Sequence, residues 1–245
     1  MDVHEVADGL EERLRGLGTA ERAEGERRYL KSDLAFLGAR LGEIHAAARD
    51  VLRRHPGLGH DELVALAEAL WSVPVFERRM ASVELLARGA ALLEVDDLSL
   101  IERLVRESKT WALVDALADD VVGRIVEREP DAATPSVDRW ATDDDFWLRR
   151  ASLLAELRAL RAGAALDRFV ARADPMLDER EFFIRKAIGW VLREAGKRRP
   201  DDVVAWLAPR THRASGVTMR EAVKYLAPPD AERLMAAYRE RRPAA

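Results

Sequence analysis

The stretch EFFIRKAIGWVLREAGKRR, residues 181–199, predicts one long helix with two unlike faces. At about 100° per residue, one face is a continuous apolar stripe made of Ile184, Ile188, Val191 and Ala195. The opposite face carries an aromatic ring within a row of three cations, made of Lys186, Trp190, Arg193 and Lys197. A hydrophobic core cannot hold that second stripe. A ring flanked by fixed positive charges suits a polyanion backbone, which is the chemistry of nucleic acids.

The alternative interpretation of this helix is structural. A tryptophan can be half-buried at the edge of a core while its basic neighbours form a solvated helix face. One helix does not decide between the two interpretations, so the rest of the chain must.

The composition indicates a soluble protein and excludes several classes of site. The chain has 245 residues and no cysteine, which excludes disulfides and thiolate metal sites and fits a reducing compartment. No run approaches the roughly 20 apolar residues that a membrane span needs. The N-terminus, MDVHEVADGLEE, is too acidic for a signal peptide. We therefore expect a cytoplasmic protein without a membrane partner.

The charge of the chain is unevenly distributed. The formal net charge is −4, which by itself argues against a nucleic-acid partner. From residue 181 onward, however, fourteen Lys and Arg stand against eight Asp and Glu, which leaves a net charge of +6 there and −10 on residues 1–180. A local basic surface therefore survives the global balance.

The periodicity predicts an all-α fold, because a period of 3.6 residues persists nearly everywhere and no convincing period of 2 is found. The expected helices span roughly residues 3–17, 19–31, 40–55, 60–71, 75–92, 97–107, 110–128, 144–161, 164–173, 178–198, 200–208, 218–226 and 229–241. Short turns such as Glu129-Pro130 and Asp174-Pro175 separate them. Helices paired by short turns favour one domain over residues 1–245, a HEAT-like solenoid of helical hairpins with a concave basic face.

Two polar residues break the pattern of the helices that carry them. Arg150 points into the apolar stripe of its helix, whereas Arg149 does not. A guanidinium on that side must be paired or lie in a cleft, because an isolated buried charge costs many kcal/mol. Trp111 and Asp115 lie together at i, i+4 beside another core stripe, so Asp115 is a plausible partner for Arg150. Taken alone, Asp115 is more often a solvated surface group and Trp111 an edge-of-core residue.

At these residues the chain resembles the AlkD-like DNA alkylation repair glycosylases, whose fold is a HEAT-like helical solenoid. The most specific match is the run from Glu181 to Trp190 with Leu192-Arg193-Glu194 behind it. The supporting matches extend over about residues 29–226 and comprise Tyr29-Leu30-Lys31, Phe36-Leu37-Gly38, Leu70-Trp71 with Glu77, Lys109-Thr110-Trp111 with Val114-Asp115, Phe146 to Arg150, and Arg220 to Lys224.

The resemblance implies removal of N3- or N7-alkylated purines from duplex DNA by hydrolysis of the N-glycosidic bond. Such a lesion is already cationic, so its base leaves without a protonating acid and one carboxylate suffices. By analogy, Asp115 stabilises the cationic sugar and positions water, and Arg150 keeps Asp115 ionised and contacts the backbone. Trp111 and Trp190 present their faces to the deoxyribose. Relatives of this type act without inserting the flipped base into a protein pocket.

The remaining matched cations and one tyrosine are the expected DNA contacts. They are Tyr29, Lys31, Arg40, Lys109, Arg149, Lys186, Arg193, Lys197, Arg220 and Lys224. Two departures affect this surface. Thr110 and Ala112 flank Trp111 where the family commonly has a second Trp and an Asp, which should change the local packing and the substrate scope. Arg40 stands where studied relatives can have a neutral side chain, which should favour phosphate contact.

Three other functions are alternatives to a glycosylase that removes small alkylated bases. A non-catalytic relative would use the same face to recognise DNA structure, although a pure binder would gain affinity by losing Asp115. A self-resistance glycosylase would excise bulky adducts, and the Arg- and Ala-rich composition suggests a GC-rich bacterial source. A protein-interaction scaffold would leave Lys186, Trp190 and Arg193 without a reason. We expect a monomer with no cofactor and no metal.

Overall fold

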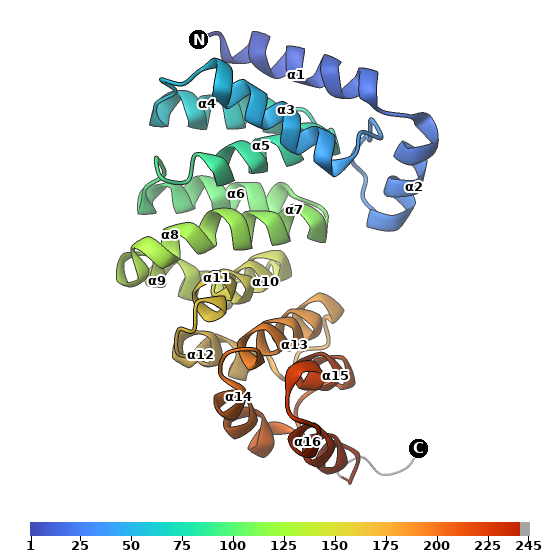
Figure 1. The fold of residues 1–245 in the computed structure, drawn as a ribbon, viewed down its shortest axis with the longest axis vertical. Helices are drawn as coiled ribbons and strands as arrows, with labels where there is room; N and C mark the ends of the chain where they lie inside the picture. Colours follow the sequence, from blue (N-terminus) through green and yellow to red (C-terminus); the bar gives the residue numbers. More distant parts are fainter. Residues whose placement is uncertain (241–245) are drawn as a thin grey trace. The chain divides into compact units, whose positions relative to one another are not determined.

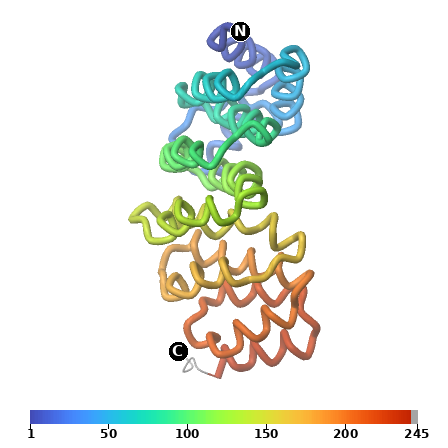
Figure 2. Tube along the Cα trace, turned by 90° about the vertical axis from the view of Figure 1, so that its left-hand side faces the viewer, coloured from blue at the N-terminus to red at the C-terminus, as the bar shows by residue number. Residues whose placement is uncertain are grey.

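The computed structural model describes residues 1–240 and is all-helical over that range. The chain divides into two compact units, Met1–Ile125 and Val126–Ala245, which are described in turn. The all-α fold class is thereby confirmed, while the single domain and its concave basic face stay predictions. In Figure 2 the chain runs back and forth within each unit as neighbouring helices joined by short turns. No helix in the described range is both long and apolar enough to cross a membrane.

The first unit follows the expected helices closely. Its elements are α1 (Val3–Leu17), α2 (Ala20–Leu30), α3 (Leu41–Arg54), α4 (His60–Trp71), α5 (Phe76–Arg88), a 3₁₀ turn (Val95–Asp97), α6 (Leu98–Glu107), α7 (Trp111–Ala116) and α8 (Gly123–Arg128), which crosses the unit boundary. Side chains cap the first two helices, since Asp2 accepts from His4 N and Glu5 N, and Thr19 accepts from Arg22 N. These caps explain why the two starts were readable from the sequence.

Helix α5 is the central element of the first unit, in contact with α1, α3, α4 and α7 (Figure 1). It is therefore buried along nearly its whole length, including the consecutive charged residues Glu77, Arg78 and Arg79. Each charge is compensated locally. Arg78 Nη1, for example, donates to Glu11 Oε2 at 2.6 Å and to Asp8 Oδ1 at 3.1 Å, which ties α5 to α1.

The expected helix 110–128 is not one regular helix. Between α7 and α8 the backbone takes a π-helical form over Leu117–Val122. Periodicity could not reveal this change, because the apolar positions Leu117, Val121 and Ile125 still face the core. Wide turns of this kind are rare and often lie at functional sites, and this one directly follows the turn that carries Asp115.

The second unit contains one helix that the sequence analysis missed. Its helices are α9 (Pro130–Ala141), α10 (Phe146–Leu154), α11 (Leu157–Arg161), α12 (Asp167–Met176), α13 (Phe182–Gly196), α14 (Pro200–Leu207), α15 (Gly216–Ala222) and α16 (Pro228–Glu240). The sequence predicts a turn at Pro130, but this proline is the first residue of α9. The N–H that proline lacks has no acceptor within the helix at that position, so its absence does not destabilise the helix. Thr134 Oγ1 donates to Pro130 O at 2.7 Å, and Trp140 is fully buried.

Other boundaries in the second unit also differ from expectation, and three of these differences have a proline or a buried charge at the boundary or lie at its last helix. The expected helix 144–161 is interrupted after Leu154, where Glu156 turns inward and accepts from Arg172 Nη1 at 2.6 Å. Helix α12 continues through Pro175 to Met176 instead of ending before the proline. The expected helix 229–241 starts one residue early, at Pro228, and its last residue lies outside the described range.

Helices α13 and α15 approach one another unusually closely, and Gly189 is the reason. A Cβ at Gly189 would lie 2.8 Å from Glu221 Cβ and 2.9 Å from Thr218 O. Thr218 Oγ1 also donates to Arg185 O across the same contact, at 2.9 Å. The missing side chain therefore sets the distance between the two helices that carry Lys186, Arg193 and Arg220.

Candidate nucleic-acid interface

In the first unit, the structure brings Trp111 next to Tyr29. Trp111 is the first residue of α7 and Tyr29 lies in the last turn of α2. Their rings meet edge to face, with centroids 5.8 Å apart and an interplanar angle of 84°. Tyr29 is 71% exposed and Trp111 is half-buried. The end of α2 and the start of α7 thus form one aromatic surface. Nothing in the sequence indicates that these two rings are in contact.

Two exposed lysines flank this aromatic pair. Lys31 ends α2 and Lys109 precedes Thr110 at the start of α7, and both have left-handed backbones with φ of 50° and 55°. That conformation is uncommon for a residue with a side chain, and it reverses the chain beside each ring. Lys31 and Lys109 thus each lie two residues along the chain from a ring, at a left-handed turn of the backbone.

Hydrogen bonds from buried side chains anchor the turn that carries Lys109 to the core of the unit. Arg79 Nη1 donates to Glu107 O at 2.5 Å, and its guanidinium lies 4.8 Å above the Trp71 ring. Trp71 Nε1 donates to Glu107 Oε2 at 2.8 Å, and Ser108 Oγ donates to Leu104 O at 2.8 Å. Burial lowers the pKa of the Arg79 guanidinium, against the opposing effect of Glu107. These contacts fix the end of α6 directly before Trp111.

Asp115 lies one turn along α7 from Trp111, on the same face, and is half-buried. The neighbouring Leu113, Val114 and Leu117 are fully buried and anchor the helix in the core of the unit. The structure therefore brings the predicted carboxylate, the two aromatic rings and the two lysines to one region of the first unit.

Arg40 occupies the start of α3, at the end of a tightly held loop. Glu77 is fully buried and accepts from Leu37 N at 2.9 Å and from Gly38 N at 2.6 Å. Gly38 has a φ of 81°, and a Cβ there would lie 2.2 Å from Thr19 O. Arg40 is exposed beyond this loop, and its N–H donates to Glu43 Oε2 at 2.6 Å. Its side chain is therefore presented to solvent by a fixed backbone.

In the second unit, α13 carries the two faces that the sequence predicted. Ile184, Ile188, Val191 and Ala195 are all fully buried. Trp190 is half-buried and Lys186 is exposed, with its Nζ 6.0 Å from the centroid of the Phe182 ring. Phe182 is itself 51% exposed, an aromatic contact candidate that the sequence analysis did not single out.

The other cations of this surface are paired with carboxylates, which the sequence analysis missed. Arg193 Nη1 donates to Glu221 Oε2 at 2.5 Å, and Lys224 Nζ donates to Glu221 Oε1 at 2.8 Å. Lys197 Nζ donates to Glu194 Oε2 at 2.8 Å. Burial raises the pKa of Glu194 and of Glu221, but the surrounding cations outweigh it, so both pKa values are lowered. Both carboxylates are therefore charged at neutral pH.

Arg150 is buried and contacts the start of α13, whereas the sequence left open whether it is paired or lies in a cleft. Its Nη1 donates to Phe183 O at 2.5 Å, and its guanidinium lies 5.8 Å from the Phe183 ring centroid. The Phe183 ring lies 4.9 Å from Trp147, in an aromatic group at the start of α10 and α13. The expected pairing of Arg150 with Asp115 stays a prediction.

Arg149 and Arg220 differ in how much of each side chain is available. Arg149 Nε and Nη2 donate to the two oxygens of Glu179, at 2.9 and 3.0 Å, and its Nη1 donates to Asp143 O and Asp144 O. Those four bonds tie the loop before α10 to the segment before α13, so the observed role of Arg149 is structural. Arg220 on α15 is exposed.

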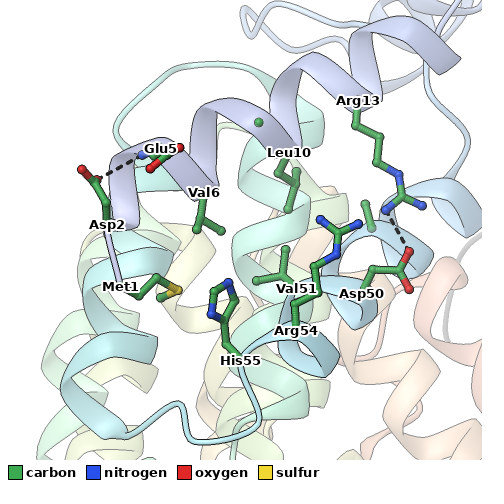
Figure 3. Close-up of a pocket in the computed structure, with 12 residues that line it drawn as sticks. Met1, Asp2, Glu5, Val6, Leu10, Arg13, Asp50, Val51, Arg54 and His55 are labelled. Carbon is green, nitrogen blue, oxygen red and sulfur yellow. Dashed lines mark hydrogen bonds and ion pairs between the residues drawn. The ribbon is translucent and has the colours of Figure 1, made fainter.

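A cavity of about 430 Å³ lies between α1 and α3, away from the predicted residues. Val6, Leu10 and Val51 form its apolar floor, and Arg54 and His55 lie at its edge (Figure 3). Asp50 closes one side through an ion pair of 2.9 Å with Arg13. None of the residues predicted to act on DNA lines this cavity.

Comparison with known proteins gives the family. Residues 10–226 match the model of a family described as "DNA alkylation repair enzyme". A predicted DNA alkylation repair enzyme from Enterococcus faecalis is similar in structure, with a TM-score of 0.77 and 24% identity over 86% of this chain and 97% of that one.

Two solved structures from Streptococcus mutans share the fold at lower similarity. AlkD2 has a TM-score of 0.61 and 19% identity over 76% of this chain and 90% of its own, and smu.31 of strain UA159 has 0.60 and 20% over 76% and 93%. No curated protein is significantly similar. Because the family model spans most of the chain, the protein belongs to the DNA alkylation repair enzyme family.

Proposed function

We propose that the protein is a DNA glycosylase that hydrolyses the N-glycosidic bond of N3- or N7-alkylated purines in duplex DNA. The observation that carries the proposal is the region of the first unit where Asp115 follows Trp111 by one helical turn. There the Trp111 ring meets the exposed Tyr29, and the exposed Lys31 and Lys109 each lie two residues along the chain from one of these rings. Carboxylate, aromatic faces and cations are the groups that this chemistry requires in one place.

The reaction needs little help with the leaving group. An N3- or N7-alkylated purine carries a positive charge, and breaking the glycosidic bond returns its electron pair to the ring and neutralises it. Positive charge then develops on the deoxyribose, where a carboxylate lowers the free energy of the transition state most effectively. Asp115 is assigned this role, together with orienting the water that attacks the sugar carbon and accepting its proton.

The aromatic residues bind the sugar instead of the base. An electron-rich indole face stabilises a nearby cation by about 0.5–2 kcal/mol, and more where water is excluded. Trp111 is assigned to that contact in the first unit. In the second unit, Trp190 lies on α13 between Lys186 and Arg193, so its ring is next to groups suited to phosphate. We assign Trp190 to a sugar contact and Lys186 to the backbone.

The test is release of 7-methylguanine from duplex DNA by the wild-type protein and by Asp115→Asn, compared at matched DNA occupancy. We expect the variant to be slower by on the order of 100-fold or more, with DNA binding retained. The matched control is Asp96→Asn, which removes the same charge from an exposed position of the same unit and should retain activity. Near-normal release by Asp115→Asn would overturn the assignment.

Failure of the wild-type protein to release 7-methylguanine despite tight binding would contradict the proposal that small alkylated purines are its substrates. The same duplex carrying a bulky N7-alkylguanine would then distinguish a bulky-adduct glycosylase from a non-catalytic reader of DNA structure. The bulky-adduct glycosylase releases that base and the reader does not.

A further inference from the structure

The basic surface of the second unit is built over two carboxylates. Its cations are Arg161, Arg193, Lys197 and Lys224, here called the basic rim, and they come from α11, α13 and the 3₁₀ turn Val223–Tyr225 after α15. Glu194 lies 2.8 Å from Lys197 Nζ and 3.7 Å from Arg161 Nε, and Glu221 lies beneath Arg193 and Lys224. Glu194 and Glu221 thus contact all four cations of the rim, and Glu221 alone is shared by Arg193 and Lys224.

The carboxylates and the cations differ in how much of each side chain is exposed to solvent. The side chains of Glu194 and Glu221 are 11% and 19% exposed, whereas those of the rim are 25–48% exposed. Lys197 and Lys224 therefore lie farther out than the carboxylates that they contact, whereas Arg193 is only slightly more exposed than Glu221. Tyr225 adds a ring that is 57% exposed, with Lys197 Nζ 4.6 Å above it. A phosphate that approaches from solvent meets the cations first.

The carboxylate of Glu221 joins the two helices through its ion pair with Arg193, but other groups join them as well. The contact between α13 and α15 is already made by Gly189 and by the Thr218 to Arg185 hydrogen bond. An apolar or amide side chain at position 221 would still fill the space beside Gly189. A charged carboxylate there has one further effect, since it cancels part of the field that Arg193 and Lys224 project onto a bound phosphate.

We propose that Glu221 sets the strength of the contact between the basic rim and the DNA backbone, weakening the binding of undamaged duplex. This inference rests on the proposed binding of duplex DNA. A repair protein meets undamaged backbone almost everywhere, and phosphate contacts carry no information about a lesion. A carboxylate under the cations lowers that uninformative part of the affinity while keeping Arg193 ordered beside Trp190.

The test compares Glu221→Gln with Glu232→Gln by fluorescence anisotropy on an undamaged duplex. Glu232 is an exposed carboxylate of α16, so both variants change the net charge equally. We expect Glu221→Gln to bind about three- to fivefold more tightly at ~50 mM salt, with a steeper salt dependence and little difference at ~300 mM. Glu232→Gln should stay close to the wild-type protein.

Equal effects of the two variants would overturn the proposal, because the cause would be net charge alone. Weaker binding by Glu221→Gln would also overturn it, because Glu221 would then serve only to order Arg193. Glu221→Ala must give the same sign as Glu221→Gln, and in an Arg193→Gln background the gain should fall to about half. A circular dichroism melt checks that each variant is folded.

The result does not depend on catalysis. Undamaged duplex offers no base to release, so a tighter Glu221→Gln variant supports the inference even where 7-methylguanine release is absent. Conversely, Asp115-dependent release with unchanged binding of Glu221→Gln overturns only the inference.

Discussion

Single buried charges hold the residues on which the proposed chemistry depends. Glu77 fixes the loop that presents Arg40, Arg79 fixes the turn before Trp111, and Arg150 fixes the start of α13. Each is a core residue that bonds to backbone at the edge of a candidate contact surface. A charge in such a place is expensive to bury unless it is paired, so each of these bonds stabilises the fold and positions a surface residue at once.

Replacing Arg150 with alanine should therefore destabilise the protein independently of any effect on catalysis. The change removes the part-buried hydrogen bond from Arg150 Nη1 to Phe183 O together with the packing of a buried side chain, and we expect a loss of about 1–3 kcal/mol in the free energy of unfolding. Urea denaturation measures this loss. Arg180→Ala, at an exposed position before α13, should stay within about 0.5 kcal/mol of the wild-type protein. Equal stability of both variants would contradict the observed role of Arg150.

At this scale the sequence identified isolated anomalies but could not identify their partners. Arg150 breaks an apolar stripe, so the sequence predicted that it is paired or lies in a cleft, and the structure places it in the interior, bonded to Phe183 O. The apolar stripe from Ile184 to Ala195 was predicted and is confirmed. The pairing of Arg193 with Glu221 was not predictable, because 28 residues separate them and each looks like a solvated charge on its own helix. The Tyr29 to Trp111 contact joins residues still farther apart in the chain.

At the scale of elements, the crossing of α13 and α15 depends on Gly189. Gly189→Ala should cost about 1–3 kcal/mol, because the new Cβ would lie within 3.0 Å of the backbone of Thr218 and force the helices apart. Gly25→Ala is the matched control within α2, where nothing lies within 4 Å, and it should be neutral or stabilising by up to about 1 kcal/mol. Thermal melts compare the two. A Gly189→Ala variant as stable as Gly25→Ala would mean that the crossing tolerates a methyl group.

A second element-scale feature is the tie between the start of α4 and the 3₁₀ turn before α6. His60 Nδ1 lies 2.9 Å from Asp61 Oδ1, and its Nε2 lies 2.9 Å from Asp97 Oδ2. The hydrogen bond to Asp61 and then that to Asp97 raise the pKa of His60 above its usual value. Because the folded state holds the proton more tightly, this stabilisation is fully present below the ordinary histidine pKa of ~6.5 and is lost as pH rises through the raised value.

The expected signature is a decrease in the free energy of unfolding as pH rises through the raised pKa of His60. His60→Gln should remove that decrease. Urea denaturation at a series of pH values measures it, and His212→Gln, at an exposed histidine of the second unit, should leave it unchanged. A slope that survives in His60→Gln would assign the titration to another group.

Helix positions were largely predictable because the apolar spacing is regular, and the exceptions have local causes. Prolines were expected to lie between helices, but Pro130 starts α9 and Pro175 lies inside α12. The π-helical segment keeps its apolar residues inward, so no periodicity marks it. Helix α9 was missed because its inward residues, such as Ala133 and Trp140, are spaced among small and polar ones.

At the scale of the whole molecule, the family match covers parts of both compact units, so the charge of the whole chain bears on the proposed DNA binding. That charge is negative overall. A net charge of −4 opposes association with DNA at long range, whereas contacts at the basic rim act within a Debye length of about 10 Å at 0.1 M salt. Binding should therefore be dominated by a few local phosphate contacts rather than by the total charge of the protein.

The dependence of DNA affinity on salt tests this description directly. Each neutralised phosphate contributes a slope of about −0.9 to a plot of log K against log salt concentration. Lys186→Gln should reduce the steepness by about 1 and weaken binding similarly on all duplex sequences. Arg233→Gln, whose cation is paired with Asp230 on α16, changes the net charge equally and should leave the slope unchanged. A flat salt dependence in the wild-type protein would exclude backbone contact and favour a protein-interaction scaffold, whereas an equal change in both variants would mean that total charge governs binding.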